Sequence, residues 1–151
     1  MIKIICVGKI KEKYLLEAIK EYEKRLSKYT KLNIIEVNDV DNPNIDIVLN
    51  KEKELIQKHV EDKDYVVTLE IEGNMLSSEE LANKIDNIFN TNSTITFIIG
   101  GSYGLHNDIK KRSNYKLSFS KLTFPHQLFR VNLLEQIYRV YRINNNESYH
   151  K

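Results

Sequence analysis

The sequence predicts an α/β domain in which a mostly parallel sheet is flanked by helices. Short apolar runs alternate along the chain with longer amphipathic stretches, which is typical of strands connected by crossover helices. Glycines directly follow two of the apolar runs, at Gly8 and at Gly100-Gly101. The length of 151 residues suits one domain, so we expect residues 1–151 to form a single one.

The first half of the chain predicts three strands and two helices. The predicted strands are Ile2–Val7, Leu32–Val37 and Tyr65–Ile71, the last stopped by Gly73-Asn74. Apolar residues recur at three- and four-residue intervals from Tyr14 to about Tyr29, which favours an amphipathic helix. An acidic loop over 38–44 precedes a more polar helix over Ile45–Val60.

The second half begins with a helix signal, because Ser77 and Glu80 have the spacing of a capping box. Leu81, Ile85, Ile88 and Phe89 then form one helical face. The elements predicted after it are a strand at Thr94–Ile99, a short polar turn or helix around Asn107–Arg112, a strand at Tyr115–Ser118, a loop at Phe119–Pro125 and a long helix at Gln127–Ile143. The face of the last helix is expected to carry Leu128, Val131, Leu134, Tyr138 and Tyr141.

Charge is segregated along the chain although the net charge is only +2. Residues 1–31 hold nine basic and four acidic residues, and residues 109–151 hold nine and two. The intervening residues 32–108 hold five basic and fifteen acidic residues. Basic ends that fold together suit a polyanion, while solvated helix faces give the same pattern without a partner.

Several classes of protein are excluded by composition. The single Cys6 cannot form an intrachain disulfide, and its apolar run favours core packing over chemistry. No stretch approaches the roughly 20 apolar residues that span a bilayer, and Lys9, Lys11 and Lys13 interrupt any signal-peptide core. We therefore expect a cytoplasmic protein without a membrane partner. The four His and one Cys have no metal-ligand spacing, so no metal is expected.

Three loops follow predicted strands and are candidates for a ligand pocket. They are Gly100–Gly104, Phe119–His126 and Glu70–Gly73. Each alone is also explained as a tight turn or as helix capping. Because open α/β sheets bind ligands at the carboxyl ends of their strands, the three together predict a pocket.

Polar residues on and after the last helix form a further candidate set. It comprises His126, Arg130, Glu135, Arg139, Arg142, Tyr149, His150 and Lys151. Arginine and lysine suit phosphate contacts, and tyrosine and histidine suit stacking on an unpaired base. A helix with three arginines is also typical of a solvated face.

The whole chain resembles the ribosomal RNA large-subunit methyltransferase H family of the SPOUT superfamily. The matching segments are Ile4–Lys13, Thr68–Glu70, Phe97–Leu105, Leu117–Arg142 and Tyr149–Lys151. The resemblance implies a homodimer with a C-terminal trefoil knot. It also implies S-adenosylmethionine-dependent methylation at N3 of a pseudouridine, position 1915 in the usual numbering, in 23S rRNA of the assembled ribosome. A SPOUT methyltransferase of transfer RNA and a non-catalytic ribosome-binding module are the alternatives.

The resemblance also implies which residues hold the methyl donor. They are Leu69, Gly100, and the loop residues Phe119, Ser120, Lys121, Leu122, Thr123 and Phe124. These belong to the three loops already singled out. Tyr103 departs from the small or polar residue expected in the glycine loop, so its ring either narrows the pocket or points to solvent.

Removal of the imide proton from N3 requires a base or cations that stabilise the anion. We hypothesise that His126, Arg139 or the pair Tyr149-His150 provide proton removal and base placement, with Glu135 orienting Arg139. A helix-start histidine bonded to backbone and a plain surface ion pair are the structural alternatives. Phosphate contacts are expected from Lys9, Lys11, Lys13 and the last helix.

Overall fold

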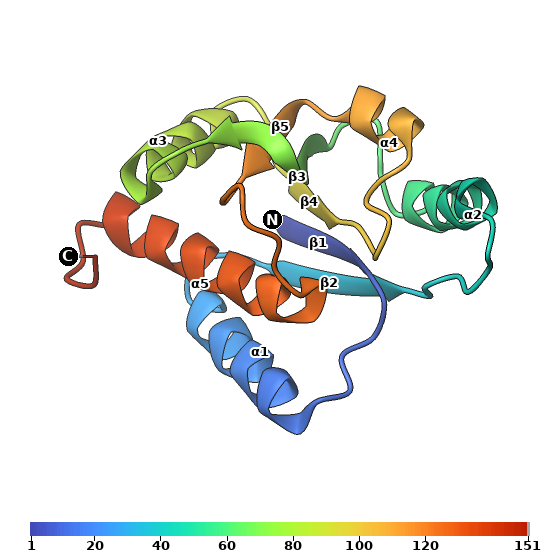
Figure 1. The fold of residues 1–151 in the computed structure, drawn as a ribbon. Helices are drawn as coiled ribbons and strands as arrows, with labels where there is room; N and C mark the ends of the chain where they lie inside the picture. The colour runs from blue at the N-terminus through green and yellow to red at the C-terminus, as the bar shows by residue number, and fades with distance from the viewer. Residues whose placement is uncertain (151) are drawn as a thin grey trace.

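The computed structural model describes residues 1–150 and contains one five-stranded parallel sheet (Figure 1). The strands are β1 (Ile2–Val7), β2 (Leu32–Val37), β3 (Tyr65–Met75), β4 (Ile95–Ile99) and β5 (Tyr115–Ser118). Their order across the sheet is β2-β1-β4-β3-β5, and every neighbouring pair is parallel. The carboxyl ends of all five strands therefore meet at one edge. The predicted α/β class is confirmed.

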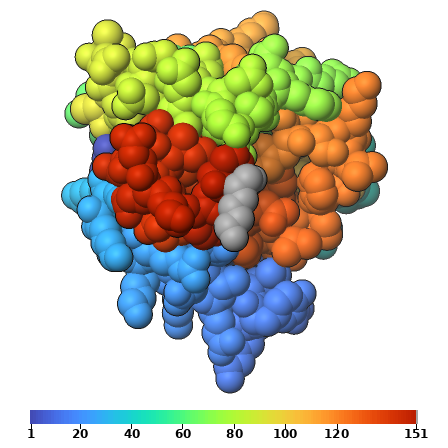
Figure 2. Space-filling view, turned by 90° about the vertical axis from the view of Figure 1, so that its left-hand side faces the viewer, coloured from blue at the N-terminus to red at the C-terminus, as the bar shows by residue number. Residues whose placement is uncertain are grey.

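Helices cover both faces of the sheet (Figure 1). They are α1 (Lys13–Leu26), α2 (Ile45–Gln57), α3 (Ser78–Phe89), α4 (Asn107–Arg112) and α5 (His126–Asn144). Helix α5 packs against α1 and α3 on one face, and α2 contacts α4 on the other. Figure 2 shows the carboxyl end of the chain between the segments of α3 and α1. No helix within residues 1–150 is long and apolar enough to cross a membrane.

The predicted end of β3 at Ile71 is wrong, since the strand continues to Met75. Leu69 and Asn74 both pair with Leu117, so an irregularity interrupts the register between them. Gly73 lies within the strand. A Cβ at this position would be 2.9 Å from the carbonyl carbon of Lys116, which explains why the residue is a glycine. The glycine permits close strand approach and does not stop the strand.

The predicted capping box at the start of α3 is confirmed, with the Glu80 amide donating to Ser77 Oγ at 3.1 Å.

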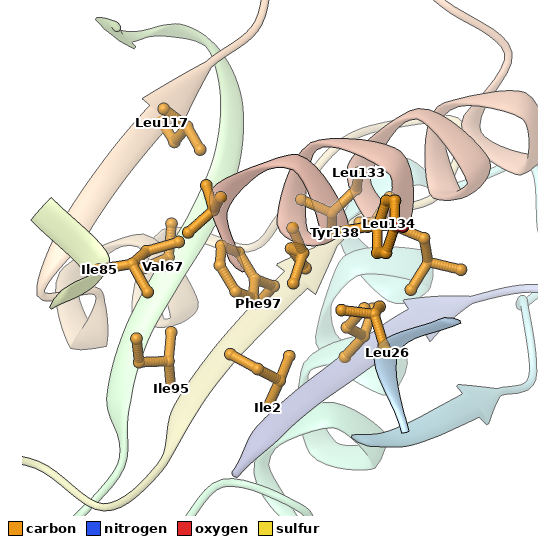
Figure 3. Packing of buried hydrophobic residues seen from close by; sticks show 14 of the residues in the cluster. Ile2, Leu26, Val67, Ile85, Ile95, Phe97, Leu117, Leu133, Leu134 and Tyr138 are labelled. Atoms are coloured by element: carbon orange, nitrogen blue, oxygen red, sulfur yellow. The ribbon is translucent and has the colours of Figure 1, made fainter. Parts of the chain in front are cut away.

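The main core lies between the sheet and helices α1, α3 and α5. Figure 3 shows Leu133, Leu134 and Tyr138 of α5 directed toward Phe97 and Ile2 of the sheet. The predicted α5 face is only partly correct. It omitted the fully buried Leu133, Ile137 and Val140 and included Leu128, which is 41% exposed. A helix that contacts a sheet and two helices buries a wider face than an amphipathic pattern indicates.

Arg130 of α5 is buried, with 2% of its surface exposed. Its guanidinium pairs with Glu36 of β2, and its Nη2 donates to the Gly8 carbonyl oxygen at 3.0 Å. The same Glu36 carboxylate accepts from the Ile10 amide at 3.1 Å. The prediction that Arg130 is available for phosphate is therefore wrong, because its guanidinium is buried and both of its terminal nitrogens donate inside the fold.

Cys6 has no exposed surface, which confirms the expected packing role. Burial raises the pKa of its thiol to about 12, outweighing the nearby positive charge of Arg130. The nucleophilic thiolate is therefore negligible at neutral pH.

Replacing Arg130 with methionine tests the buried ion pair. The substitution keeps an apolar stem and removes the hydrogen bonds to Gly8 and Glu36. Because Glu36 retains 36% side-chain exposure, we expect a loss of about 2–4 kcal/mol in the free energy of unfolding, near the lower end for a broken buried pair. Urea denaturation measures it. Lys13→Met, in an exposed pair with Glu17, should change stability by about 0.5 kcal/mol or less. Equal effects of both substitutions would contradict the anchoring role of Arg130.

Candidate functional site

A cavity of about 450 Å³ lies at the carboxyl edge of the sheet. It is formed where the chain leaves β3, β4 and β5, so the three predicted loops meet in space. Its lining is Leu69, Glu70, Ile71, Glu72, Ile99, Gly100, Gly101, Ser102, Gly104, Leu105, Lys110, Leu117, Ser118, Phe119, Ser120, Leu122, Thr123, Phe124, His126 and Phe129.

The glycine loop after β4 is tightly folded. The Gly104 amide donates to the Gly101 carbonyl oxygen at 3.1 Å, and Gly104 has a φ of +78°. A Cβ on Gly100 would lie 2.6 Å from the Gly104 carbonyl oxygen, so no side chain fits there unless the loop shifts. Tyr103 is 51% exposed and is not part of the cavity lining. Its ring therefore points to solvent and does not narrow the pocket.

Aromatic rings form one wall of the cavity. Phe129 of α5 packs against Phe119 with ring centroids 4.8 Å apart and stacks with Phe124 at 6.1 Å. The loop that carries two of these rings is braced by Ser120, whose hydroxyl accepts from the Leu122 amide at 3.0 Å. The result is an apolar aromatic wall in which the Phe119 ring is inclined by 59° to that of Phe129, and such a wall can pack against an aromatic ligand.

Acidic groups form another part of the lining. Glu70 and Glu72 follow the regular part of β3, and Lys110 of α4 is the ammonium nearest to them in the lining. Thr68 Oγ1 donates to Glu70 Oε2 at 2.6 Å. No group of three or more His, Cys, Asp or Glu residues within 1–150 is arranged to hold a metal ion.

The structure gathers almost all of the residues predicted to hold the methyl donor. Leu69, Gly100 and five of the six residues from Phe119 to Phe124 line the cavity. Lys121 is the exception, being exposed and outside the lining. The sequence patterns assigned no role to Phe129, Lys110 or the carboxylates of Glu70 and Glu72. The only signal for the two carboxylates was their position in the loop Glu70–Gly73, at the end of a predicted strand.

The proposed catalytic residues fall into two groups within one chain. His126, the first residue of α5, lines the cavity, and its Nε2 is 3.8 Å from where a Cβ of Gly8 would stand. Glu135 and Arg139 lie nine and thirteen positions further along α5. At about 1.5 Å per residue, they are about 13–20 Å from His126 along the helix axis.

The second group is a connected polar network that holds the end of the chain. Arg139 Nε donates to Glu135 Oε1 at 2.9 Å, its Nη1 lies 3.0 Å from His150 Nδ1, and its guanidinium lies over the Tyr149 ring at 4.8 Å. His150 Nε2 is 2.6 Å from Glu79 Oε1 of α3. Hydrogen bonding to Glu135 raises the pKa of Arg139. The pKa of Glu79 is lowered mainly by a backbone hydrogen bond and, as the second cause, by its hydrogen bond with His150.

The tautomer of His150 follows from its partners. Arginine has only donors, so His150 Nδ1 must accept from Arg139. Nε2 then carries the proton that is donated to Glu79. The network is satisfied by a neutral imidazole, which docks Tyr149 and His150 beside Arg139.

The fold and the cavity define an α/β protein with a small-ligand site at the carboxyl edge of a parallel sheet. The family described as "Predicted SPOUT methyltransferase" matches residues 1–150. The chain belongs to the SPOUT methyltransferase family and, within it, to the ribosomal RNA large subunit methyltransferase H group.

Similar proteins support this membership over the whole length. Proteins named "Ribosomal RNA large subunit methyltransferase H" from Clostridium botulinum strains Langeland and Okra are each 56% identical, with 99% of both chains covered. A solved structure of a probable methylase family protein from Haemophilus influenzae Rd KW20 aligns with a TM-score of 0.59 at 12% identity. That alignment covers 99% of this chain and 70% of the other, and it shows similarity of fold.

Arg139→Lys tests the docking of the chain end. Lysine cannot reproduce the planar set of donors that reaches Glu135 and His150 together. Loss of about 1 kcal/mol of hydrogen bonding should raise the population of undocked tail about fivefold, which lowers the NMR order parameters of Tyr149 and His150. Arg25→Lys, which alters a similar pair with Glu21, should leave these order parameters unchanged. Unchanged order parameters in Arg139→Lys would show that Arg139 does not hold the tail.

Proposed function

We propose that this protein is an S-adenosylmethionine-dependent methyltransferase of large-subunit ribosomal RNA that modifies N3 of pseudouridine 1915 in 23S rRNA. The observation that carries the proposal is the single cavity formed by the loops that the family resemblance assigns to the methyl donor. The names of the relatives at 56% identity support the RNA substrate class.

The cavity fits the proposed cofactor in size and chemistry. Its volume of about 450 Å³ lies within the range of small-molecule sites. The close approach of Gly100 to Gly104 leaves backbone groups bare of side chains for hydrogen bonds to an adenine edge. Phe119, Phe124 and Phe129 offer an apolar wall to its ring. The carboxylates of Glu70 and Glu72 suit a ligand that carries positive charge.

S-adenosylmethionine, when bound, supplies a methyl group on a positively charged sulfur. In the proposed reaction N3 would take this methyl group, the sulfur would keep the electrons of the carbon–sulfur bond, and the N3 proton would pass to a general base. His126 is the imidazole in the cavity lining and is the base we propose. Arg139 would position the pseudouridine and stabilise the charge on the carbonyl oxygens of that nucleobase. Glu135 would in turn hold Arg139 in position.

A homodimer reconciles the two separated groups of residues. Apolar side chains stay exposed beside the cavity, with Leu122 70% exposed, Leu128 41% and Phe124 36%. Covering this surface with a second copy is favourable, and it would allow the Arg139 and Tyr149-His150 group of one chain to approach the cavity of the other. The trefoil knot and cytoplasmic location are further proposals from the family resemblance.

The surface of the proposed dimer offers candidate contacts for 23S rRNA in the assembled ribosome. Lys9, Lys11 and Lys13 are exposed around the loop that leads into α1. Their ammonium groups are available for phosphate contacts, which would make binding dependent on salt concentration.

Two measurements test the proposed function directly. Calorimetric titration of the purified protein with S-adenosylmethionine should show binding, and absence of binding would leave a non-catalytic ribosome-binding module. Mass mapping of ribosomal RNA from cells lacking the gene should show loss of one methyl group at the 23S pseudouridine. An intact 23S modification together with a missing methyl group in transfer RNA would overturn the substrate assignment.

Gly100→Ala tests the cofactor assignment. The added Cβ would lie 2.6 Å from the Gly104 carbonyl oxygen, so the loop must shift at the cavity wall. We expect affinity for S-adenosylmethionine to fall by about tenfold or more, comparable to the large effects of overpacking. Tyr103→Ala is the control, because Tyr103 lies in the same loop but is 51% exposed and outside the cavity lining. It should change the affinity for S-adenosylmethionine by less than about twofold.

Arg139→Ala tests the proposed role in substrate placement. We expect methylation of ribosomes to fall by about 10²-fold or more, as for loss of a donor at developing charge, while calorimetric affinity for S-adenosylmethionine changes less than about twofold. A variant with full rate would remove Arg139 from the mechanism. Removal of residues 149–151 is a companion test, and normal modification by the shortened protein would exclude the tail from the acceptor site.

A further inference from the structure

The strongest unassigned feature of the cavity is the carboxylate of Glu70. We propose that Glu70 is a specificity-determining residue that recognises the positive charge of the methyl donor, so that the cavity distinguishes S-adenosylmethionine from the uncharged sulfur of its product, S-adenosylhomocysteine. This inference rests on the proposed function.

Glu70 is held in place while one of its oxygens stays open. Its side chain is 12% exposed, and Oε2 accepts a hydrogen bond from Thr68 at 2.6 Å. The nearest cation to Oε1 is Lys110 Nζ at 3.9 Å, which is beyond hydrogen-bond distance. Within residues 1–150, Oε1 accepts no hydrogen bond. Glu70 belongs to the cavity lining, and a carboxylate there with one oxygen free of a close partner is suited to a cationic ligand.

The charge of the surrounding lining also favours a cationic ligand. Glu70 and Glu72 contribute two carboxylates, and Lys110 contributes the one ammonium group of the lining. Lys110 has a 39% exposed side chain, so solvent weakens its compensation of Glu70. The lining therefore favours a cation over a neutral ligand.

The donor and the product differ by one methyl group and one positive charge. Their adenine, ribose, ammonium and carboxylate groups are the same, so contacts to those groups favour neither ligand. A fixed carboxylate with a 12% exposed side chain interacts with the extra charge through several ångströms. Glu70 would thus favour binding of the charged donor and release of the product after transfer.

Glu70→Gln tests the proposal without measuring methylation. The substitution keeps the shape of the side chain and removes its charge. Calorimetric titration with S-adenosylmethionine and S-adenosylhomocysteine should show donor affinity reduced about three- to tenfold and product affinity changed less than twofold. Glu72→Gln is the matched control on the same loop, and its exposed side chain should give a smaller change in the ratio.

Lys110→Gln supplies an independent test in the opposite direction. Removing this partly exposed ammonium leaves Glu70 uncompensated, so the ratio of donor to product affinity should rise. Equal weakening of both ligands in Glu70→Gln would assign Glu70 to a shared group such as the ribose hydroxyls and overturn the proposal. An unchanged ratio in both variants would also overturn it. Failure of the unaltered protein to bind either ligand would instead refute the proposed function, and this inference with it.

Discussion

The buried guanidinium of Arg130 is the contact on which the carboxyl edge of the sheet depends. It joins α5 to the Gly8 carbonyl at the end of β1 and to Glu36 in β2. Its Nε has no hydrogen-bond partner within residues 1–150, so part of its desolvation cost is not recovered. A buried ion pair is weak evidence for net stability, so we infer that this one contributes mainly to a specific arrangement. Here the arrangement is the position of the first turn of α5.

That position determines the shape of the cavity. Arg130 lies four residues after His126, so fixing one places the other at the cavity. The loop from Phe119 to Phe124 is then held at both ends, by β5 before it and by α5 after it. Phe129, adjacent to Arg130, supplies the ring against which Phe119 and Phe124 pack. The aromatic wall is therefore a consequence of where α5 begins.

Most of the fold could be predicted from the sequence because its signals are local. Apolar runs marked the five strands, and the capping box at Ser77 and Glu80 marked the start of α3. The errors arose where distant contacts decide the outcome. From sequence alone Gly73 predicts the end of a strand, whereas in the structure it allows the backbone of Lys116 to approach. Arg130 reads as a surface arginine, because its partners Gly8 and Glu36 are 122 and 94 residues away in sequence.

The candidate site also combines features that local sequence patterns predict with features that depend on distant contacts. The rule that strand ends meet at one edge was sufficient to bring the three loops together, whereas the open oxygen of Glu70 depends on distances to Thr68 and Lys110 that no pattern encodes. The network around Arg139 depends equally on geometry. Glu135 and His150 engage its Nε, Nη1 and Nη2, yet a guanidinium has five N–H donors. Arg139 can therefore keep the chain end docked and still offer a donor to a carbonyl oxygen. Docking of the tail and contact with a substrate base are compatible in one side chain, so the tail need not leave Arg139 for the proposed reaction to occur.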